Sequence, residues 1–494
     1  MIKVLFTIGA IQVLQMTVLL ARTKGLALLL GPEQVGVLAV IDKLVAVFVQ
    51  TASLSLPFAA LRFLPSLWNS NRLEFDRRLR GMSIVLLGLA CLAMAAGLGV
   101  TLVDPGRWGE QLAPFWPIVL VALLTIPVQA FVPFVQNATA AAFAPHRSML
   151  FAVAHAVVFT LSGLCGAWWF GLEGIYALYV VPGALLVGFA VARLNAPADR
   201  GPRPPATALS AVRLPREIWQ FGLALFALTF LAPYAALFLH YRVLRDLGPE
   251  SAGWMQAAIG ISLAVRTVLG SAHPVFLTPN VNRGGTPEQR MQWASDFQKT
   301  LCFLTGIVLP PLLLFPDVAV RLLYSSEFLP GAQSVFLFVL VEIVTLLAGT
   351  YQSLVLALDR LGYHVAQNMT AQGVMIVVGA VAIRRFGIPG AALAALSAQL
   401  FLYMSTTVFL RRSFGLRLPL RAALLAAYLV AILLVAGLVG RSQSAIDWHS
   451  FFVRVGVYTA LVGGLALFLT RADHNRLAEL VRQMSNRALA VVRT

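Results

Sequence analysis

The segment Leu30-Gly31-Pro32-Glu33 recurs 217 residues later as Leu247-Gly248-Pro249-Glu250. The same offset pairs Gly36 with Gly253. One match of four residues would be weak, but several matches in the same order at nearly constant spacing indicate an internal duplication. The sequence therefore predicts two copies of one structural unit.

A further match lies later in each copy, where the offset is one residue shorter. Phe170-Gly171-Leu172-Glu173-Gly174 corresponds to Phe386-Gly387-Ile388-Pro389-Gly390. Both segments stand between two apolar runs, so they occupy equivalent topological places. This agreement extends the duplication over most of the chain.

Apolar runs surround these motifs from one end of the chain to the other. The 494 residues are 59% hydrophobic and 12% charged, whereas soluble domains carry about 25% charged residues. Runs of about 20 apolar residues are long enough to span a bilayer as helices. The sequence predicts an all-α integral membrane protein with about 14 transmembrane helices, at 4–23, 35–65, 80–103, 112–138, 148–170, 173–193, 217–241, 252–279, 297–323, 329–358, 365–384, 388–411, 418–440 and 451–470.

Six predicted spans fall in each copy, and an even number gives both copies the same orientation in the membrane. Such parallel repeats are common in transporters, where two lobes enclose a central cavity that opens to either side. The predicted organisation is an N-terminal six-helix lobe (1–195), a Pro- and Arg-rich cytoplasmic linker (196–216), a C-terminal six-helix lobe (217–412), an additional helix pair (413–470) and a basic amphipathic tail on the inner leaflet (471–494).

The formal net charge of +17 is better explained by topology than by nucleic-acid binding. Basic residues gather in alternate short loops, as the positive-inside rule requires of cytoplasmic loops. This alternation predicts that both termini lie in the cytoplasm. Arg384 and Arg385 are exceptions, since they fall on the predicted outer side.

The Leu-Gly-Pro-Glu-x-x-Gly turn after a first span that ends in basic residues resembles the oligosaccharide (O-antigen-type) flippases of the multidrug/oligosaccharidyl-lipid/polysaccharide exporter superfamily. The two Phe-Gly-x-x-Gly segments, the six-plus-six duplication and the extra terminal pair strengthen the likeness. The resemblance implies V-shaped lobes, alternating access, a bacterial inner-membrane location and an undecaprenyl-pyrophosphate-linked oligosaccharide as cargo. It also implies membrane lipids and glycan polymerase or export machinery as partners.

Four basic residues within or at the ends of spans are the candidate ligands of such a pyrophosphate: Arg22, Lys24, Lys43 and Arg266. Arg offers planar, bidentate hydrogen bonds to phosphate oxygens and Lys offers a point charge. In related flippases, basic residues of the first, second and eighth spans line the cavity, and these four lie in the corresponding spans. The structural alternative for Arg22 and Lys24 is that their side chains extend from the end of the span toward the lipid head groups.

Two acidic residues within spans, Asp42 and Glu342, have two interpretations that the sequence leaves open. A carboxylate inside a membrane must be protonated or paired. Each residue is therefore either an ion-coupling site or the structural partner of a buried cation.

Rival functions differ in the chemistry that they require. A drug/cation antiporter of the same superfamily needs acidic residues in its cavity, and spans one and seven contain none. A membrane glycan polymerase needs a catalytic cluster on a large outer loop, which is missing here, and a scaffold for polysaccharide export needs no buried charge. No phosphate-binding glycine-rich loop is present. We therefore expect a transporter that is not an enzyme, has no cofactor, and is driven by H⁺, Na⁺, the membrane potential or a substrate gradient.

Overall fold

The computed structural model describes residues 2–142, 145–195, 214–270, 273, 277, 281, 285–417, 419–442 and 448–465. The regular structure in these ranges is helical throughout. Up to residue 195 the helices are α1 (Ile2–Ser53), α2 (Leu56–Phe63), α3 (Pro65–Ser70), α4 (Arg72–Val103), η1 (Pro105–Trp108), η2 (Ala113–Phe115), α5 (Trp116–Leu123), α6 (Ile126–Ala141), α7 (Pro145–Phe170) and α8 (Gly174–Asn195). After residue 214 they are α10 (Arg216–Leu247), α11 (Pro249–Gly270), α13 (Pro287–Leu314), α14 (Pro316–Leu323), η4 (Ser326–Gly331), α15 (Ala332–Ala357), α16 (Leu361–Phe386), α17 (Ile388–Phe414), α18 (Leu420–Ser442) and α19 (Trp448–Leu465).

Among the described residues, 11 helices are long and apolar enough to cross a membrane, or 12 spans if the bent pair of residues 113–123 and α6 counts as one. The 52-residue α1 is long enough for two spans. Gly31 interrupts its helical geometry with φ 70° and ψ 178°, so the helix divides at this residue. The described part of each of the fourteen predicted spans falls on one of the helices or helix pairs, although the ends of the spans 252–279 and 451–470 lie largely outside the described residues. The prediction of an all-α, multi-pass membrane protein is therefore confirmed.

The backbone repeats the duplication seen in the sequence. Gly31 (φ 70°) and Gly248 (φ 91°) both adopt the left-handed region, and each precedes the proline that begins the next helical segment. Gly171 (φ 63°) and Gly387 (φ 65°) form a second matched pair at the ends of α7 and α16. Glycine adopts positive φ without the steric penalty of a Cβ, so these motifs act as equivalent turns in both copies.

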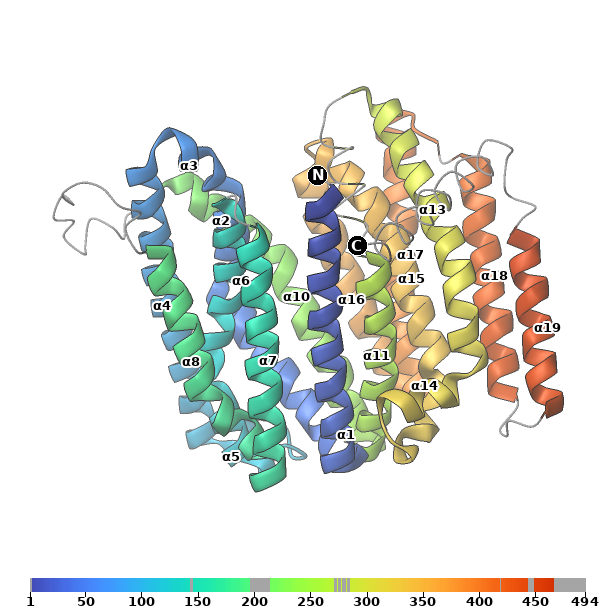
Figure 1. Ribbon diagram of the computed structural model, residues 1–494, viewed down its shortest axis with the longest axis horizontal. Helices are drawn as coiled ribbons and strands as arrows, with labels where there is room; N and C mark the ends of the chain where they lie inside the picture. The colour runs from blue at the N-terminus through green and yellow to red at the C-terminus, as the bar shows by residue number, and fades with distance from the viewer. Residues whose placement is uncertain are drawn as a thin grey trace, which may run out of the picture. The chain divides into compact units, whose positions relative to one another are not determined.

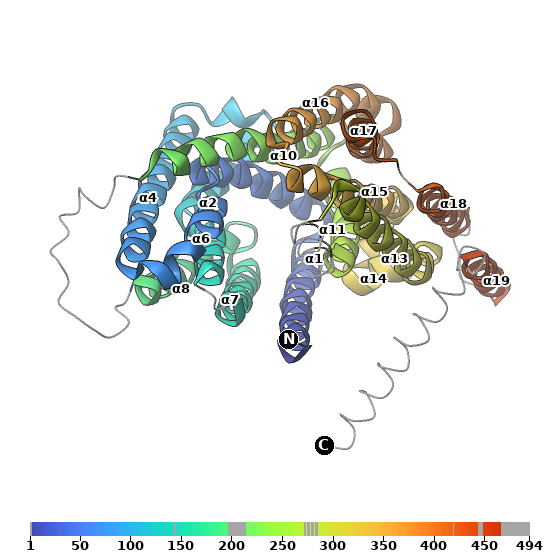
Figure 2. The ribbon, with the colours of Figure 1, turned by 90° about the horizontal axis from the view of Figure 1, so that it is seen from above.

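Helix packing is duplicated as well. The first part of α1 packs along α7, and the equivalent α10 packs along α16 (Figure 2). Close glycine contacts join both pairs, since Gly25 faces Leu164 and Gly379 faces Leu239. The two copies therefore share the pairing of equivalent helices as well as sequence motifs.

The chain divides into two compact units, which are described separately. The first unit comprises Met1–Ala264, Asp317–Val341 and Arg360–Leu402, and the second comprises Val265–Pro316, Glu342–Asp359 and Tyr403–Thr494. Within the first unit, α7 packs against α8 and α1, and α6 against α2, α4 and α7 (Figure 1). Within the second unit, α13 packs against α18 and α19.

Proline breaks the second predicted span where the sequence indicates. Leu54 and Ser55 adopt positive φ (40° and 57°) just before α2, whose second residue is Pro57. Pro65 then ends α2 and begins α3. A proline within a helix removes a hydrogen bond and clashes with the preceding turn, which explains both interruptions.

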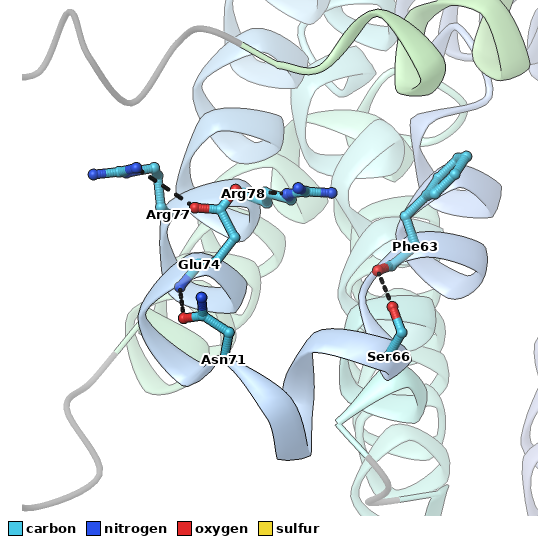
Figure 3. A network of polar contacts seen from close by, with 6 residues as sticks. All are labelled: Phe63, Ser66, Asn71, Glu74, Arg77 and Arg78. Carbon is cyan, nitrogen blue, oxygen red and sulfur yellow. Dashed lines mark hydrogen bonds and ion pairs between the residues drawn. The ribbon is translucent and has the colours of Figure 1, made fainter.

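The segment after this span is held by a polar network (Figure 3). Asn71 caps α4 because its side-chain oxygen accepts the Glu74 backbone N–H at 3.0 Å. Glu74 also pairs with Arg78 at 2.7 Å and with Arg77 at 3.5 Å. Two arginines of the predicted cytoplasmic segment between the spans 35–65 and 80–103 therefore share one carboxylate.

Two predicted segments lie outside the described residues. These are nearly all of the linker, 196–213, and the whole amphipathic tail, 471–494. The lobe boundaries at 195 and 217 and the cytoplasmic location of the termini stay predictions.

Candidate functional site

Arg266 and Glu342 form an ion pair within the second unit. Arg266 lies in the last described turn of α11 and Glu342 near the middle of α15. The Arg266 Nη1 and Glu342 Oε2 atoms are 3.4 Å apart, with 49% of the arginine side chain and 13% of the glutamate side chain exposed. The pair holds the acid in a largely buried place while half of the guanidinium side chain stays accessible.

This geometry leaves the Arg266 guanidinium able to bind a second anion. The Glu342 carboxylate is its one side-chain partner among the described residues. A guanidinium carries five N–H donors in a fixed planar fork, so most of them remain available. Among the predicted ligands, Arg266 therefore has the geometry best suited to a phosphate group.

Arg22 lies in the first unit, on the face of α1 that packs against α7. Its guanidinium carbon stands 4.0 Å from the centre of the Phe159 ring, a cation–π contact. The Nε and Nη2 atoms are buried and have no hydrogen-bond partner among the described residues. Gly163 leaves room for the head group, because a Cβ there would lie 3.3 Å from Nε.

Asp42 belongs to the same polar cluster in the core of the first unit. Its Oδ1 accepts a hydrogen bond from the Tyr176 hydroxyl at 2.7 Å. Asp42 lies within electrostatic range of Arg22, although no ion pair within 4.0 Å joins the two described side chains. On the neighbouring helix turn, Tyr179 and His155 share a hydrogen bond of 2.8 Å between the hydroxyl and Nε2. We name Arg22, Asp42, His155, Tyr176 and Tyr179 the inner polar cluster.

Lys24 is held elsewhere in the first unit, by the backbone at the C-terminal end of α14. Its ammonium donates to the carbonyl oxygen of Arg321 at 2.7 Å and to that of Tyr324. Carbonyls at the C-terminal end of a helix carry partial negative charge, which favours a cation there. Lys24 thus has structural partners in two backbone carbonyls.

Lys43 is half-buried on α1 and lies within electrostatic range of His240 on α10. His240 itself is buried and hydrogen-bonded, through Nδ1 to the Ala236 carbonyl oxygen at 2.8 Å and through Nε2 to Gln256 at 3.1 Å. Within the first unit, Lys43 is therefore close to His240 and, among the described residues, has no hydrogen bond or ion pair to the inner polar cluster.

The predicted site residues belong to both units. In the first unit, Arg22 and Asp42 share the inner polar cluster, whereas Lys24 and Lys43 have other partners. In the second unit, Arg266 and Glu342 form an ion pair. Sequence reasoning missed Tyr176 and Tyr179, which complete the inner cluster. Their spacing of three residues in an otherwise apolar span puts both hydroxyls on one helix face and was the signal that could have revealed them.

No family model and no curated protein matches the chain by sequence. Solved structures match it by fold. A lipid II flippase, MurJ, in an inward closed conformation is similar with a TM-score of 0.68 at 12% identity, over 94% of this chain and 98% of that one. The chain shares the fold of a flippase.

Transporters of other kinds have the same fold. An inward-facing multidrug resistance MATE family transporter of the MOP superfamily matches with a TM-score of 0.55 at 12% identity, over 85% of this chain and 96% of that one. A MOP superfamily transporter from Pyrococcus furiosus, described as having a binding pocket of reverse polarity, matches with a TM-score of 0.56 at 11% identity, over 87% and 95%. At these identities the likeness establishes the fold of the chain and leaves its substrate to be argued from its residues.

Proposed function

We propose that this protein is a flippase that moves an undecaprenyl-pyrophosphate-linked oligosaccharide, or a related polysaccharide precursor, from the cytoplasmic to the outer leaflet by alternating access. It would act in the bacterial inner membrane with both termini in the cytoplasm. Its partners would be the lipid-linked oligosaccharide, membrane lipids and glycan polymerase or export machinery. The likeness of fold to a lipid II flippase over almost the whole of both chains supports this assignment.

The observation that carries the proposal is the accessible guanidinium of Arg266. It is a cation on an apolar helix, and its one described side-chain partner occupies a single edge of the head group. A diphosphate loses strong hydration when it enters a membrane protein, and bidentate arginine bonds can replace part of that hydration. The surplus of cations over acids among the predicted site residues favours an anionic cargo over a cationic one.

Leaflet counting in cells tests the proposal. Arg266→Ala would be expressed in a strain that lacks the native gene, and lipid-linked glycan would be counted on each leaflet. We expect the glycan to accumulate on the cytoplasmic side with transport reduced by about tenfold or more, the equivalent of at least one charge-assisted hydrogen bond. Arg266→Lys should retain part of the activity because it keeps the charge.

The control is Arg412→Ala, which removes an exposed arginine from the last turn of α17. It should leave transport unchanged at equal membrane insertion. Normal transport by a fully inserted Arg266→Ala variant would contradict the phosphate-binding role of this residue and the proposed cargo with it.

A drug/cation antiporter is the second candidate, supported by the shared fold of a multidrug resistance transporter. It would use Asp42 or Glu342 to bind a cationic substrate. The two candidates separate in one comparison: overexpression should raise resistance to lipophilic cations if the antiporter is correct, and should restore surface glycan in the deletion strain if the flippase is correct.

A further inference from the structure

The internal duplication allows one place to be compared in both copies. The place lies near the ends of the paired helices α1–α7 and α10–α16. There the sequence offsets relate a group of apolar residues in the N-terminal copy to a largely charged group in the C-terminal copy. The apolar set is Gly25, Leu28, Leu29, Leu164, Cys165, Trp168 and Trp169; its counterparts are Arg242, Arg245, Asp246, Ala380, Val381, Arg384 and Arg385.

In the N-terminal copy this place is an open apolar groove. The groove has a volume of about 610 Å³ and is lined by the seven residues of the apolar set. Leu28, Trp168 and Trp169 are 62%, 72% and 66% exposed. Aromatic side chains of this kind gather where membrane meets water, so this helix end fits a position at the membrane interface.

In the C-terminal copy the same place is a cluster of arginines around one acid. Asp246 pairs with Arg242 at 3.1 Å, with Arg245 at 2.9 Å and with Arg384 at 3.7 Å. Arg242 also donates to the Ala380 carbonyl oxygen at 3.3 Å. Arg385 is exposed and has no acidic partner within 4.0 Å among the described residues. We name Arg242, Arg245, Asp246, Arg384 and Arg385 the arginine cluster.

The arginine cluster carries more positive charge than its surroundings neutralise. It has four guanidinium groups and one carboxylate. Each of the two helix ends adds about half a negative charge from its dipole, which still leaves an excess of roughly two positive charges. The side chains of Arg245 and Arg384 are 36% and 66% exposed, so part of this charge is open to a ligand.

The packing of these helix ends does not require the charges. The first part of α1 and α7 pair in the N-terminal copy with leucine, cysteine and tryptophan at the equivalent positions. Arg384 and Arg385 also fall on the predicted outer side, where the positive-inside rule disfavours arginine. Neither the packing seen in the N-terminal copy nor the predicted topology therefore accounts for arginine at positions 384 and 385.

We propose that the arginine cluster binds the phosphate group of an anionic lipid at the predicted outer face of the membrane. Arg384 and Arg385 supply the accessible donors, and the pair of Arg242 with Asp246 fixes the base of the site. The ligand chemistry is a phosphate on a lipid, which either a phospholipid of that leaflet or the pyrophosphate of a polyprenyl carrier offers. The site is defined by binding alone and does not require the proposed cargo.

Lipid retention measured by native mass spectrometry of the purified protein tests this site. The probes are phosphatidylglycerol, undecaprenyl pyrophosphate and, as a lipid without phosphate, diacylglycerol. We expect Arg384→Gln combined with Arg385→Gln to weaken retention of at least one phosphate lipid by about tenfold, since each lost arginine removes charge-assisted hydrogen bonds. Diacylglycerol retention should not change.

The matched control is Arg411→Gln combined with Arg412→Gln, which removes an adjacent exposed pair from the last turn of α17. A selective loss of phosphatidylglycerol would identify a bilayer phospholipid as the ligand, and a selective loss of undecaprenyl pyrophosphate would identify the carrier. Arg384→Lys with Arg385→Lys should retain most of the binding if the variants fold alike. Equal retention of both phosphate lipids by the glutamine variant and the control would overturn the proposal.

Discussion

Gly36 and Gly253 each face the carbonyl oxygen of the proline that begins the other's helical segment. A Cβ on Gly36 would collide with the Pro249 oxygen, and one on Gly253 would collide with the Pro32 oxygen. Both residues belong to the first unit. Reciprocal contacts of this kind arise when two equivalent surfaces meet about a two-fold axis. The duplicated turns therefore pair with each other where their second spans begin.

Substitution of either glycine should disturb this crossing. We expect Gly36→Ala and Gly253→Ala each to destabilise the protein by about 1–3 kcal/mol, because backbone atoms on the other helix cannot move aside as a flexible side chain can. The free energy of unfolding in mixed micelles checks this. Gly99→Ala is the control, since no atom lies within 4 Å of the added methyl group; equal stability of all three variants would contradict the close packing.

Lys24 should prove to be a structural residue as well as a predicted ligand. Lys24→Met removes two hydrogen bonds to backbone carbonyls, and we expect a loss of about 1.5–3 kcal/mol in unfolding free energy. Lys24→Arg should recover part of it. Unfolding and glycan transport would be measured on the same preparations. Unchanged stability with lost transport would instead assign Lys24 to the substrate.

The hydrogen bond from Tyr176 to Asp42 should contribute measurably to the inner polar cluster. Tyr176→Phe leaves the half-buried Asp42 carboxylate with one donor fewer, and we expect a loss of about 1–3 kcal/mol. The loss of unfolding free energy in the double variant Tyr176→Phe, Asp42→Asn should differ from the sum of the losses in the two single variants, because the residues are in contact. Tyr234→Phe, at a side chain that is 46% exposed, is the neutral control. Fully additive effects would mean that the two side chains do not interact.

Glu342 should behave as the counter-ion of Arg266. Glu342→Gln removes one charge of a pair whose arginine is half exposed, so we expect a modest loss of about 1 kcal/mol. In the presence of Arg266→Gln the same change should have a smaller effect. The alternative role is ion coupling, which would appear as a transport rate that no longer responds to a proton or sodium gradient in the Glu342→Gln variant while stability is kept.

Much of the fold was predictable because its signals are local. The apolar runs identified the helices, and the paired glycines at 31 and 248 identified the repeated turns, since a positive φ is a property of one residue and its neighbours. Arg266 and Glu342 also stood out, because an ionisable residue on an apolar helix is conspicuous in any span.

The partners of those residues were not predictable. Arg266 and Glu342 are 76 positions apart, and Tyr176 and Asp42 are 134 apart. Two residues on different helices meet only when the rotation of each helix about its axis and its position along that axis bring them together. Van der Waals packing along the whole helix determines both.

The sequence by itself determined that the chain is a duplicated bundle of membrane helices with cations on several of them. Only the tertiary structure decided that Lys24 binds backbone carbonyls, that Glu342 neutralises part of Arg266, and that one duplicated helix end became an apolar groove while the other gathered arginines. Hydrophobicity and turn geometry act within a few residues of the chain, whereas the pairing of charges depends on which helix faces meet in space.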